Sequence, residues 1–357
     1  MQRSSPCLGR ARFILIYQEE HTNHKKRILT GHRPTGPRHI GHLTGTLENW
    51  VRMQAIYDCY FLVADIHVLT TDYEHPGEIR SNTLEMLADW LAAGIDPLQS
   101  HIVLQSALPQ HAQLALLLAN LATVARLERV PTYKEQVQQL NLNPSLGFLA
   151  YPILQTADIL IYKANAVPVG EDQLPHLELA REVARRFNLI FGDTFPEPEG
   201  LLSQTPRLPG TDNRAMHTSY GNTIALRDTP EDTTQKVMNM FTDPTRIHAS
   251  DPGHVEGNPV FAYLDLFDPD SAEVEDFKHR YRVGKIGDVQ IKRRLAVVLN
   301  DNLAPLRRRR AEFIKQPEYL IEVLRQGTQA ALPTVQATFE EVRQKMGLIQ
   351  LNRLAAI

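Results

Sequence analysis

The stretch Thr30-Gly-His-Arg-Pro-Thr-Gly-Pro-Arg-His-Ile-Gly-His42 decides how the rest of the chain can be arranged. It carries three glycines and two prolines, so it cannot be a regular helix. A short apolar run precedes it, and residues 43–56 come after it with apolar side chains spaced for one face of a helix. The expected order is therefore a strand, a glycine-rich turn and the N-terminus of a helix.

A turn of this kind points free backbone N–H groups and the positive end of a helix dipole at an anion. His39 and His42 stand where the helix begins, so their ring nitrogens could add donors to the same anion. Gly41 would let a flat ring approach the backbone closely. The stretch fits a site for nucleotide phosphates and adenine, and it fits equally well an ordinary loop with surface histidines.

The composition is that of a globular protein with room for two domains. The chain has 357 residues, of which 43% are hydrophobic and 22% charged. No apolar run is long enough to cross a bilayer, so we expect no membrane partner. A net charge of −3 limits any nucleic-acid contact to a local patch. Cys7 and Cys59 follow no metal-ligand pattern and indicate a reducing compartment, so we expect a cytoplasmic protein without a bound metal.

Residues 1–25 differ from the rest of the chain, because they are polar and charged apart from one apolar patch at residues 13–16. The arginines and serines near the start faintly resemble a transit peptide, but Glu19 and Glu20 argue against one. We expect a poorly ordered N-terminal extension.

From residue 26 onward, strand and helix patterns alternate. Strands are expected at residues 60–65 and 101–105, and helices at residues 78–93 and 110–125. Strands separated by helices of this length predict an α/β domain over residues 26–226, with a Rossmann-like parallel sheet covered by helices on both faces. Ligands bind at the carboxyl ends of such strands, so the opening stretch, Asp65 and His67 should share one edge.

A second polar group is expected between residues 149 and 173. Asp158 lies in an otherwise apolar helix, where an unpaired carboxylate would be costly. It could pair with another element, or it could accept a hydrogen bond from a ligand. Asp172 and Gln173 come after a strand, at the start of the next helix, where they could meet ribose hydroxyls or an ammonium group.

The segment at residues 196–212 is rich in proline and glycine and is predicted to be a linker. Beyond the polar loop at residues 214–226, an all-helical C-terminal domain is predicted over residues 227–357. Its expected helices span residues 232–240, 272–283, 288–303, 306–314, 317–329 and 333–346. Two basic clusters, residues 292–294 and 307–310, are either solvated helix faces or a nucleic-acid surface.

His39-Ile-Gly-His42 is the HIGH signature of class I aminoacyl-tRNA synthetases. Residues 151–188 resemble tryptophanyl-tRNA synthetases of the bacterial type more than the tyrosine enzymes, and residues 208–226 occupy the place of the second family signature, KMSKS. The resemblance covers about residues 26–348. It implies that ATP, as its Mg²⁺ complex, and tryptophan form tryptophanyl-adenylate, and that a homodimer then charges tRNA(Trp). Residues 227–357 would bind the anticodon, with the two basic clusters as the first place to look.

The resemblance also implies roles for individual residues. The catalytic group would be His39, His42, Arg33, Lys134, His217 and Ser219. ATP would be bound by Gly31, Arg33, His39, Gly41, His42, Asp172 and Met216. Tryptophan would be bound by Leu29, His67, Tyr151, Gln155, Asp158, Val167, Val169 and Gln173. Because the indole N–H is a donor only, Asp158 would be its acceptor. On this basis, Asp158→Ala is expected to abolish tryptophan activation and to leave the fold intact.

The chain departs from the family pattern at the second signature, where it has Ala215-Met216-His217-Thr218-Ser219 and lacks both lysines. Loss of one preorganised donor typically costs about 2.7–4 kcal/mol, or roughly 10²–10³ in rate. Arg214 or His217 could substitute in part. We therefore expect slow adenylate formation. The alternative is a paralogue that binds tryptophan, nucleotide or a further protein partner without useful catalysis. Another nucleotidyltransferase of the HIGH type is disfavoured by the helical C-terminal half.

A second departure concerns the iron–sulfur cluster that some relatives hold through four cysteines. The corresponding positions here are Asn258, Tyr281, Asp288 and Ile291. None of these side chains is a thiolate, so no iron–sulfur cluster and no zinc are expected.

Overall fold

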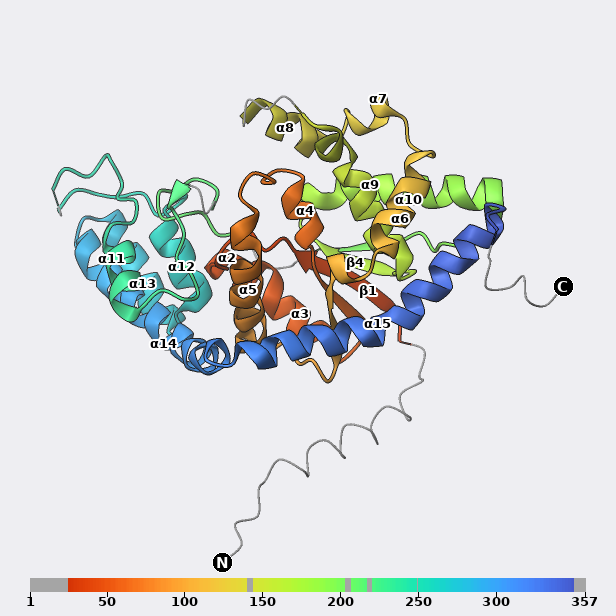
Figure 1. Ribbon diagram of the computed structural model, residues 1–357. Coiled ribbons are helices and arrows are strands. Elements are labelled where there is room, and N and C mark those ends of the chain that lie inside the picture. The colour runs from red at the N-terminus through yellow and green to blue at the C-terminus, as the bar shows by residue number, and fades with distance from the viewer. Residues whose placement is uncertain (1–24, 140–143, 203–206, 217–219, 249, 350–357) are drawn as a thin grey trace, which may run out of the picture.

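The computed structural model describes residues 25–139, 144–202, 207–216, 220–248 and 250–349 (Figure 1). All of the predicted N-terminal extension except Lys25 lies outside these residues, as do His217 and Ser219 of the predicted catalytic group.

Five parallel strands form one sheet in the order β3-β2-β1-β4-β5. The strands are β1 (Arg27–His32), β2 (Asp58–Val63), β3 (Ser100–Leu104), β4 (Ala166–Val169) and β5 (Glu199–Leu202). The strand order reverses beside β1, between β2 and β4, which opens a crevice at the carboxyl ends of these strands. The opening stretch of the sequence leaves β1 at this point.

Helices cover both faces of the sheet, as predicted. Side chains alternate across a strand, and those of β1 and β2 divide accordingly between two apolar clusters. Leu29, Tyr60 and Leu62 join the cluster of α6 (Gln110–Ala119), α9 (Leu146–Ile161) and α10 (Leu174–Phe191). Ile28 and Phe61 join the cluster of α3 (Glu48–Met53), α5 (Ile79–Ala93) and α14 (Asp288–Ile314). The predicted α/β class is confirmed.

Several local predictions were wrong in detail. The helix expected at residues 43–56 is α2 (Ile40–His42), a π-helical turn at Leu43–Leu47, and α3. The second strand ends at Val63, because Asp65 begins α4 (Asp65–Leu69) and its Oδ1 accepts the N–H groups of Ile66 and Ser106. Instead of running to residue 125, α6 ends at Ala119, and α7 (Val124–Leu127) and α8 (Pro131–Gln139) come next.

The predicted linker at residues 196–212 contains β5. This strand has four residues, lies at the sheet edge and shows no alternation of buried and exposed positions. A short edge strand of this kind leaves no periodic pattern in the sequence.

The C-terminal region is helical, as predicted, but its two long helices are continuous. Its helices are α11 (Pro230–Met238), α12 (Pro259–Phe267), α13 (Ser271–Arg282), α14 and α15 (Pro317–Lys345). Pro305 and Pro333 lie inside α14 and α15, where we had predicted breaks. Helix α14 packs along α5 and α11, and α15 packs along β3 and α5; this packing offsets the hydrogen bond that each proline removes. The prediction had missed α12.

Helix α15 runs back along the sheet and covers its β3 edge (Figure 1). The backbone at Gly327 lies so close to Ile102 that a Cβ atom there would overlap the carbonyl oxygen of Ile102. The N–H of Leu104 donates to Thr328 Oγ1 at 3.0 Å. The edge strand is therefore covered by the last helix of the C-terminal region. Within the described ranges, no helix is both long enough and apolar enough to cross a bilayer.

Candidate active site

The opening stretch is fixed by the segment that comes after the second signature. The N–H of Ile40 donates to the carbonyl of Ile224 at 2.9 Å, and the N–H of Leu226 donates to the carbonyl of Arg38 at 2.9 Å. These two hydrogen bonds form an antiparallel bridge around His39 and Ala225. The structure therefore brings together two segments that the sequence analysis had connected only through the family resemblance.

Met216 lies directly over the glycine of the opening stretch. A Cβ atom at Gly41 would lie 2.9 Å from Met216 Sδ and 3.1 Å from the ring of His39, so only glycine leaves both contacts undisturbed. Arg214, the predicted substitute for a lysine, donates from Nε to Asp212 at 2.7 Å. Its charge is therefore already balanced by a carboxylate.

The tautomer of His42 is set by its hydrogen bond. Its Nδ1 accepts the backbone N–H of His39 at 3.2 Å, so the proton of the neutral ring lies on Nε2. Burial and the neighbouring charge of Arg38 lower the pKa of His42 well below its ordinary value. At neutral pH this ring can therefore donate to an anion as an uncharged imidazole.

Asp158 is buried and fully hydrogen-bonded. Its carboxylate accepts from His67 Nε2 at 2.9 Å and from His111 Nδ1 at 2.7 Å. Gln105 Nε2 lies 2.9 Å and 2.8 Å from its two oxygens. Burial alone would raise the pKa of Asp158, but the bonds from His111 and His67 outweigh it and hold the pKa far below its usual range.

These contacts correct one expectation and reveal two residues that the sequence analysis missed. Replacing Asp158 with alanine would leave three buried donors without an acceptor, so the fold should not be expected to remain intact. Gln105 comes directly after β3, and the rule that sites lie at the carboxyl ends of strands could have found it. His111 lies within α6, and no sequence pattern pointed to it.

The predicted apolar walls lie on the two strands beside the crevice. Leu29 on β1 and Val167 on β4 are buried in one apolar cluster, and Val169 packs against it. Thr30 Oγ1 donates to the carbonyl of Pro168 at 3.3 Å, which joins the same two strands.

Four other predicted residues come together at the start of α10. Gln155 Nε2 lies 3.5 Å from Gln173 Oε1, and Gln173 Nε2 donates to Asp172 at 3.0 Å. Tyr151 lies one turn before Gln155 on α9, and its hydroxyl is 3.0 Å from Thr132 Oγ1.

Arg33 faces this end of the site, while Lys134 does not join it. The phenol of Tyr151 has a pKa raised by burial, and the charge of Arg33 together with the bond to Thr132 opposes that rise. Lys134 is exposed on α8, and within the described residues no hydrogen bond or ion pair connects it to the opening stretch.

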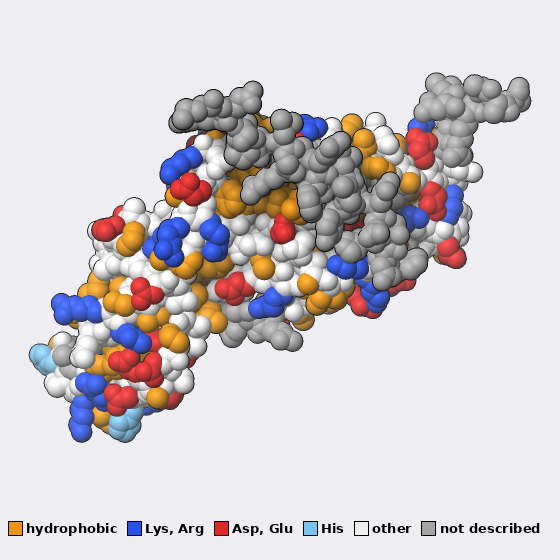
Figure 2. Space-filling view, turned by 90° about the horizontal axis from the view of Figure 1, so that it is seen from below, with side chains coloured by type: hydrophobic (Ala, Val, Ile, Leu, Met, Phe, Trp, Pro, Cys, Tyr) orange, Lys and Arg blue, Asp and Glu red, His pale blue; other side chains and the backbone are white. Residues whose placement is uncertain are grey.

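The two basic clusters are largely engaged within the chain. Lys292 is buried and donates to the carbonyl of Met240 at 2.6 Å. The other engaged side chains are Arg294 on Asp268, Arg307 on Asn300, Arg309 on the carbonyl of Ala92, and Arg310 on Asp89. Figure 2 shows charges of both signs mixed over the face that it draws. Neither cluster is therefore a free row of cations for nucleic acid.

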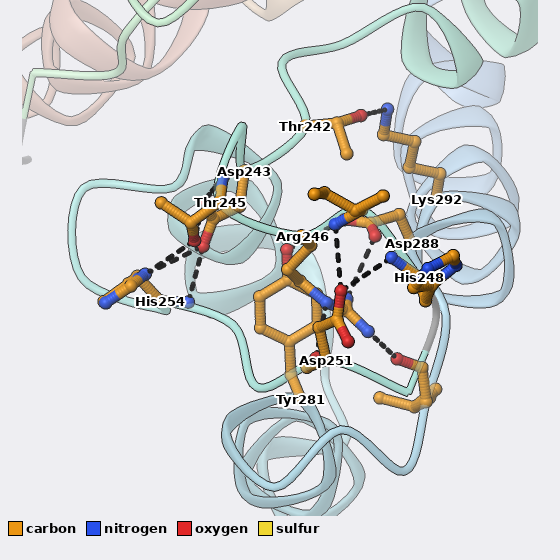
Figure 3. A network of polar contacts seen from close by, with 12 residues as sticks. Thr242, Asp243, Thr245, Arg246, His248, Asp251, His254, Tyr281, Asp288 and Lys292 are labelled. Atoms are coloured by element: carbon orange, nitrogen blue, oxygen red, sulfur yellow. Dashed lines mark hydrogen bonds and ion pairs between the residues drawn. The ribbon is translucent and has the colours of Figure 1, made fainter.

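Two of the four positions that the resemblance connects with cysteines in some relatives belong to a hydrogen-bonded network (Figure 3). Tyr281 donates to Asp288 at 2.8 Å, and Arg246 donates to the same carboxylate at 3.0 Å. The guanidinium of Arg246 lies 4.1 Å from the centroid of the Tyr281 ring. Asn258 accepts the N–H of Val260 as a helix cap, and Ile291 is buried among apolar side chains. This donor set does not fit an iron–sulfur cluster.

A cavity of about 710 Å³ has Asp65, which was expected at the site edge, among its lining residues. It opens between α5, α15 and the end of β3, and most of its lining is apolar. None of the residues predicted to bind ATP or tryptophan lines it. The residues predicted to bind ATP and tryptophan lie instead at the strand ends beside β1 and β4 and on the helices next to them.

The fold and the site define a class I aminoacyl-tRNA synthetase. A family model described as "tRNA synthetases class I (W and Y)" matches residues 21–304. The chain is 47% identical to the tryptophan–tRNA ligase of Treponema pallidum over 326 residues, which cover 90% of this chain and 97% of that protein. It is 46% identical to the same enzyme of Thermotoga maritima over 326 residues, with 90% and 99% of the two chains covered.

A solved structure supports the same family. Tryptophanyl-tRNA synthetase from Campylobacter jejuni, complexed with ADP and tryptophan, matches with a TM-score of 0.81 and 30% identity, over 90% of this chain and 100% of that chain. The tyrosyl enzyme of Archaeoglobus fulgidus shares the fold at a TM-score of 0.62 and 25% identity, over 81% of this chain and 91% of that chain. This chain belongs to the tryptophanyl-tRNA synthetase family, whose members are ATP-dependent tryptophan–tRNA ligases. The predicted family is confirmed.

One prediction concerns His176, which the sequence analysis had not singled out. Its Nε2 lies 2.6 Å from Thr132 Oγ1, and burial lowers its pKa to about 4, against an opposing effect of Asp172. Between pH 6.5 and 4 the unfolded chain therefore binds more protons at this residue than the folded chain does. The free energy of unfolding should fall as the pH is lowered through this window, by about 2 kcal/mol from this residue alone between pH 7 and 5.

Urea unfolding at pH 7 and pH 5 measures this effect. His176→Gln should lose less stability between the two pH values than the parent chain does. His75→Gln is the matched control, because His75 is exposed and Asp72 raises its pKa. An equal loss in His176→Gln and the parent would contradict the assignment.

Proposed function

We propose that this chain activates tryptophan with ATP and transfers the tryptophanyl group to tRNA(Trp) in the cytoplasm, with a first step slower than in relatives that keep both signature lysines. The observation that carries the proposal is the bridge between Arg38–Ile40 and Ile224–Leu226, which holds the HIGH turn at the carboxyl edge of the sheet, beside the proposed tryptophan pocket. The sequence identity to tryptophan–tRNA ligases supports the same conclusion.

In the first step a carboxylate oxygen of tryptophan attacks the α-phosphorus of ATP, and pyrophosphate leaves with its Mg²⁺. This chemistry needs positioning and charge stabilisation rather than a nucleophilic side chain. His42 can donate from Nε2, and His39 lies beside it with ring centroids 3.8 Å apart. Because Met216 already covers Gly41, adenine would pack against Met216 at this turn, and Asp172 would bind the ribose. Arg33 and Lys134 are assigned to the phosphates on the family resemblance.

Tryptophan would enter between β1 and α9 with its indole N–H directed at Asp158. The four contacts already made by that carboxylate match its lone-pair capacity, so one donor has to yield. His67 is the candidate, because its side chain is 10% exposed while that of His111 is 0% exposed. Leu29, Val167 and Val169 would form the walls. The ammonium group would meet the three polar side chains at the other end: Tyr151, Gln155 and Gln173.

The helical region over residues 227–357 is proposed to bind the tRNA anticodon. Most side chains of the two basic clusters are paired within the chain. Arg293 and Arg308 are exposed, and they are therefore the members of these clusters best placed for RNA phosphates. His217 and Ser219 of the second signature are kept in the proposal on resemblance alone. The alternative, a paralogue that binds its ligands without catalysis, rests on the two missing lysines.

A charging assay with tryptophan, ATP, Mg²⁺ and tRNA(Trp) tests the function, and Asp158→Asn tests the pocket. Asparagine keeps the size of the side chain but removes the charged acceptor. We expect kcat/KM for tryptophan in pyrophosphate exchange to fall about 10²-fold, the loss typical of a charged hydrogen bond, with little change in the KM for ATP.

Asp172→Asn provides the matched comparison, since it should raise the KM for ATP and leave that for tryptophan unchanged. Unaltered tryptophan kinetics in a folded Asp158→Asn enzyme would sink the pocket assignment. A parent chain that binds tryptophan and ATP, yet yields neither exchange nor charged tRNA, would establish the paralogue instead.

The missing lysines generate a second prediction. The double variant Ala215→Lys/Thr218→Lys restores both charges that face the leaving pyrophosphate in the family. We expect its kcat for pyrophosphate exchange to rise at least about tenfold, because one such donor is typically worth roughly 10²–10³ in rate. Ala215→Gln/Thr218→Gln adds similar length without charge and should give no such increase. Equal rates in the lysine variant and the parent would refute this account of the slow step.

We also propose a homodimer, formed through the exposed apolar side chains of α6 and α9. Leu116 is 72% exposed and Leu146 is 81% exposed, and these two helices are neighbours. A contiguous exposed apolar patch marks an interface more often than a free surface, and we propose that these two leucines contribute to one. Leu116→Glu/Leu146→Glu should shift the molar mass in light scattering toward the monomer. Leu189→Glu on α10, which is 87% exposed in the parent, serves as the control. A parent that is already monomeric would contradict the proposal.

A further inference from the structure

The buried acid Asp89 has no part in the proposed chemistry, although it contacts the opening stretch. It lies on α5 and its side chain is fully buried. One carboxylate oxygen accepts the backbone N–H of Arg38 at 3.1 Å, one residue before the HIGH signature. The other oxygen accepts Nε of Arg310, from α14, at 2.7 Å. A buried carboxylate is costly without such partners, so both contacts matter to this acid.

Arg38 shapes the turn from within. Its side chain is buried, and its Nη2 donates to the carbonyl of Arg33 at 3.2 Å and to that of Gly36 at 2.9 Å. Burial lowers the pKa of Arg38 to about 10, with Asp89 opposing the shift, so the guanidinium remains charged at neutral pH. Asp89 is thus the counter-charge of the group that closes the turn.

Glu85 lies one helical turn before Asp89 and extends the network. It forms an ion pair with Arg310 and lies 3.8 Å from a guanidinium nitrogen of Arg227. Arg227 is next to Leu226, whose N–H donates to the carbonyl of Arg38. A single face of α5 therefore holds the opening turn, the segment after the second signature, and α14.

We propose that Asp89 and Arg310 are positioning residues that hold the turn from Arg33 to His42 in the form that binds ATP, although neither touches the nucleotide. The inference rests on the proposed function. Without Arg310, the buried carboxylate keeps Arg38 as its remaining close cation and draws that guanidinium from the carbonyls of the turn, or it takes up a proton. Either change relaxes the turn and lowers ATP affinity. Through this pair, the position of α14 in the helical region sets the affinity of the turn for ATP.

Arg310→Gln tests the pair, and Arg309→Gln is its matched control. Arg309 donates from the same helix to the carbonyl of Ala92 on α5 at 2.7 Å, but it makes no contact with Asp89. We expect Arg310→Gln to weaken the binding of Mg²⁺-ATP about tenfold in isothermal titration calorimetry. This is the lower end of the range for one charged hydrogen bond, because Arg310 acts on ATP only through the turn. The affinity for tryptophan should not change. Arg309→Gln should leave both affinities as in the parent.

Two more variants separate positioning from general stability. Arg310→Lys restores the charge and should recover part of the ATP affinity. Asp89→Asn should weaken ATP binding as Arg310→Gln does, and the double variant should be no worse than either, because both remove the same interaction. Equal effects of Arg310→Gln and Arg309→Gln would overturn the inference, as would a lower melting temperature with unchanged ATP affinity.

Calorimetry keeps this test separate from that of the proposed function. A parent that binds ATP but gives no pyrophosphate exchange would refute the catalytic proposal alone, and the comparison of variants would still decide the role of Arg310. A parent that binds no ATP would overturn both.

Discussion

The structure depends on one constraint, which is that a turn of three glycines and two prolines must be held from several sides. The sheet supplies its start through β1, and the bridge to residues 224–226 supplies its end. Ile40, inside the HIGH signature, is buried in the same apolar cluster as the helices of the C-terminal region. His39 and His42 flank this anchor. The signature therefore packs the α/β region against the helical region through Ile40, and its two histidines can also donate to an anion.

Asp158 shows a second constraint, because a carboxylate in an apolar helix has to be balanced. Two histidines and a glutamine do so, and they fix the orientation of the acid before any ligand arrives. The acid therefore keeps its orientation when a ligand donor arrives, and only one of its present donors has to yield. The same balance explains why the acid cannot be removed as a neutral test of function, since its three donors would then be left buried and unpaired.

The places where the chain departs from its family have different structural consequences. At the cysteine positions, Tyr281, Asp288 and Arg246 form a hydrogen-bonded network within the helical region. At the second signature, Met216 keeps its contact above Gly41, while Arg214 is paired with Asp212. The packing of this signature against the opening turn is thus retained, although its lysine charges are absent. The absence of the two lysines should therefore lower the rate of the first step and leave the packing of the site largely unchanged.

The sequence by itself determined the parallel sheet apart from its edge strand β5, and the turn after β1, because strand periodicity, glycine and proline act locally along the chain. It also determined the family through its ordered motifs. Only the tertiary structure decided which partners balance the buried charges. Arg310 and Asp89 are 221 positions apart, and Gln105 and Asp158 are 53 apart. Pro305 and Pro333 remain inside helices for the same reason. Packing between segments that are far apart in the sequence stabilises these ion pairs and helices, and a local sequence pattern does not show such packing.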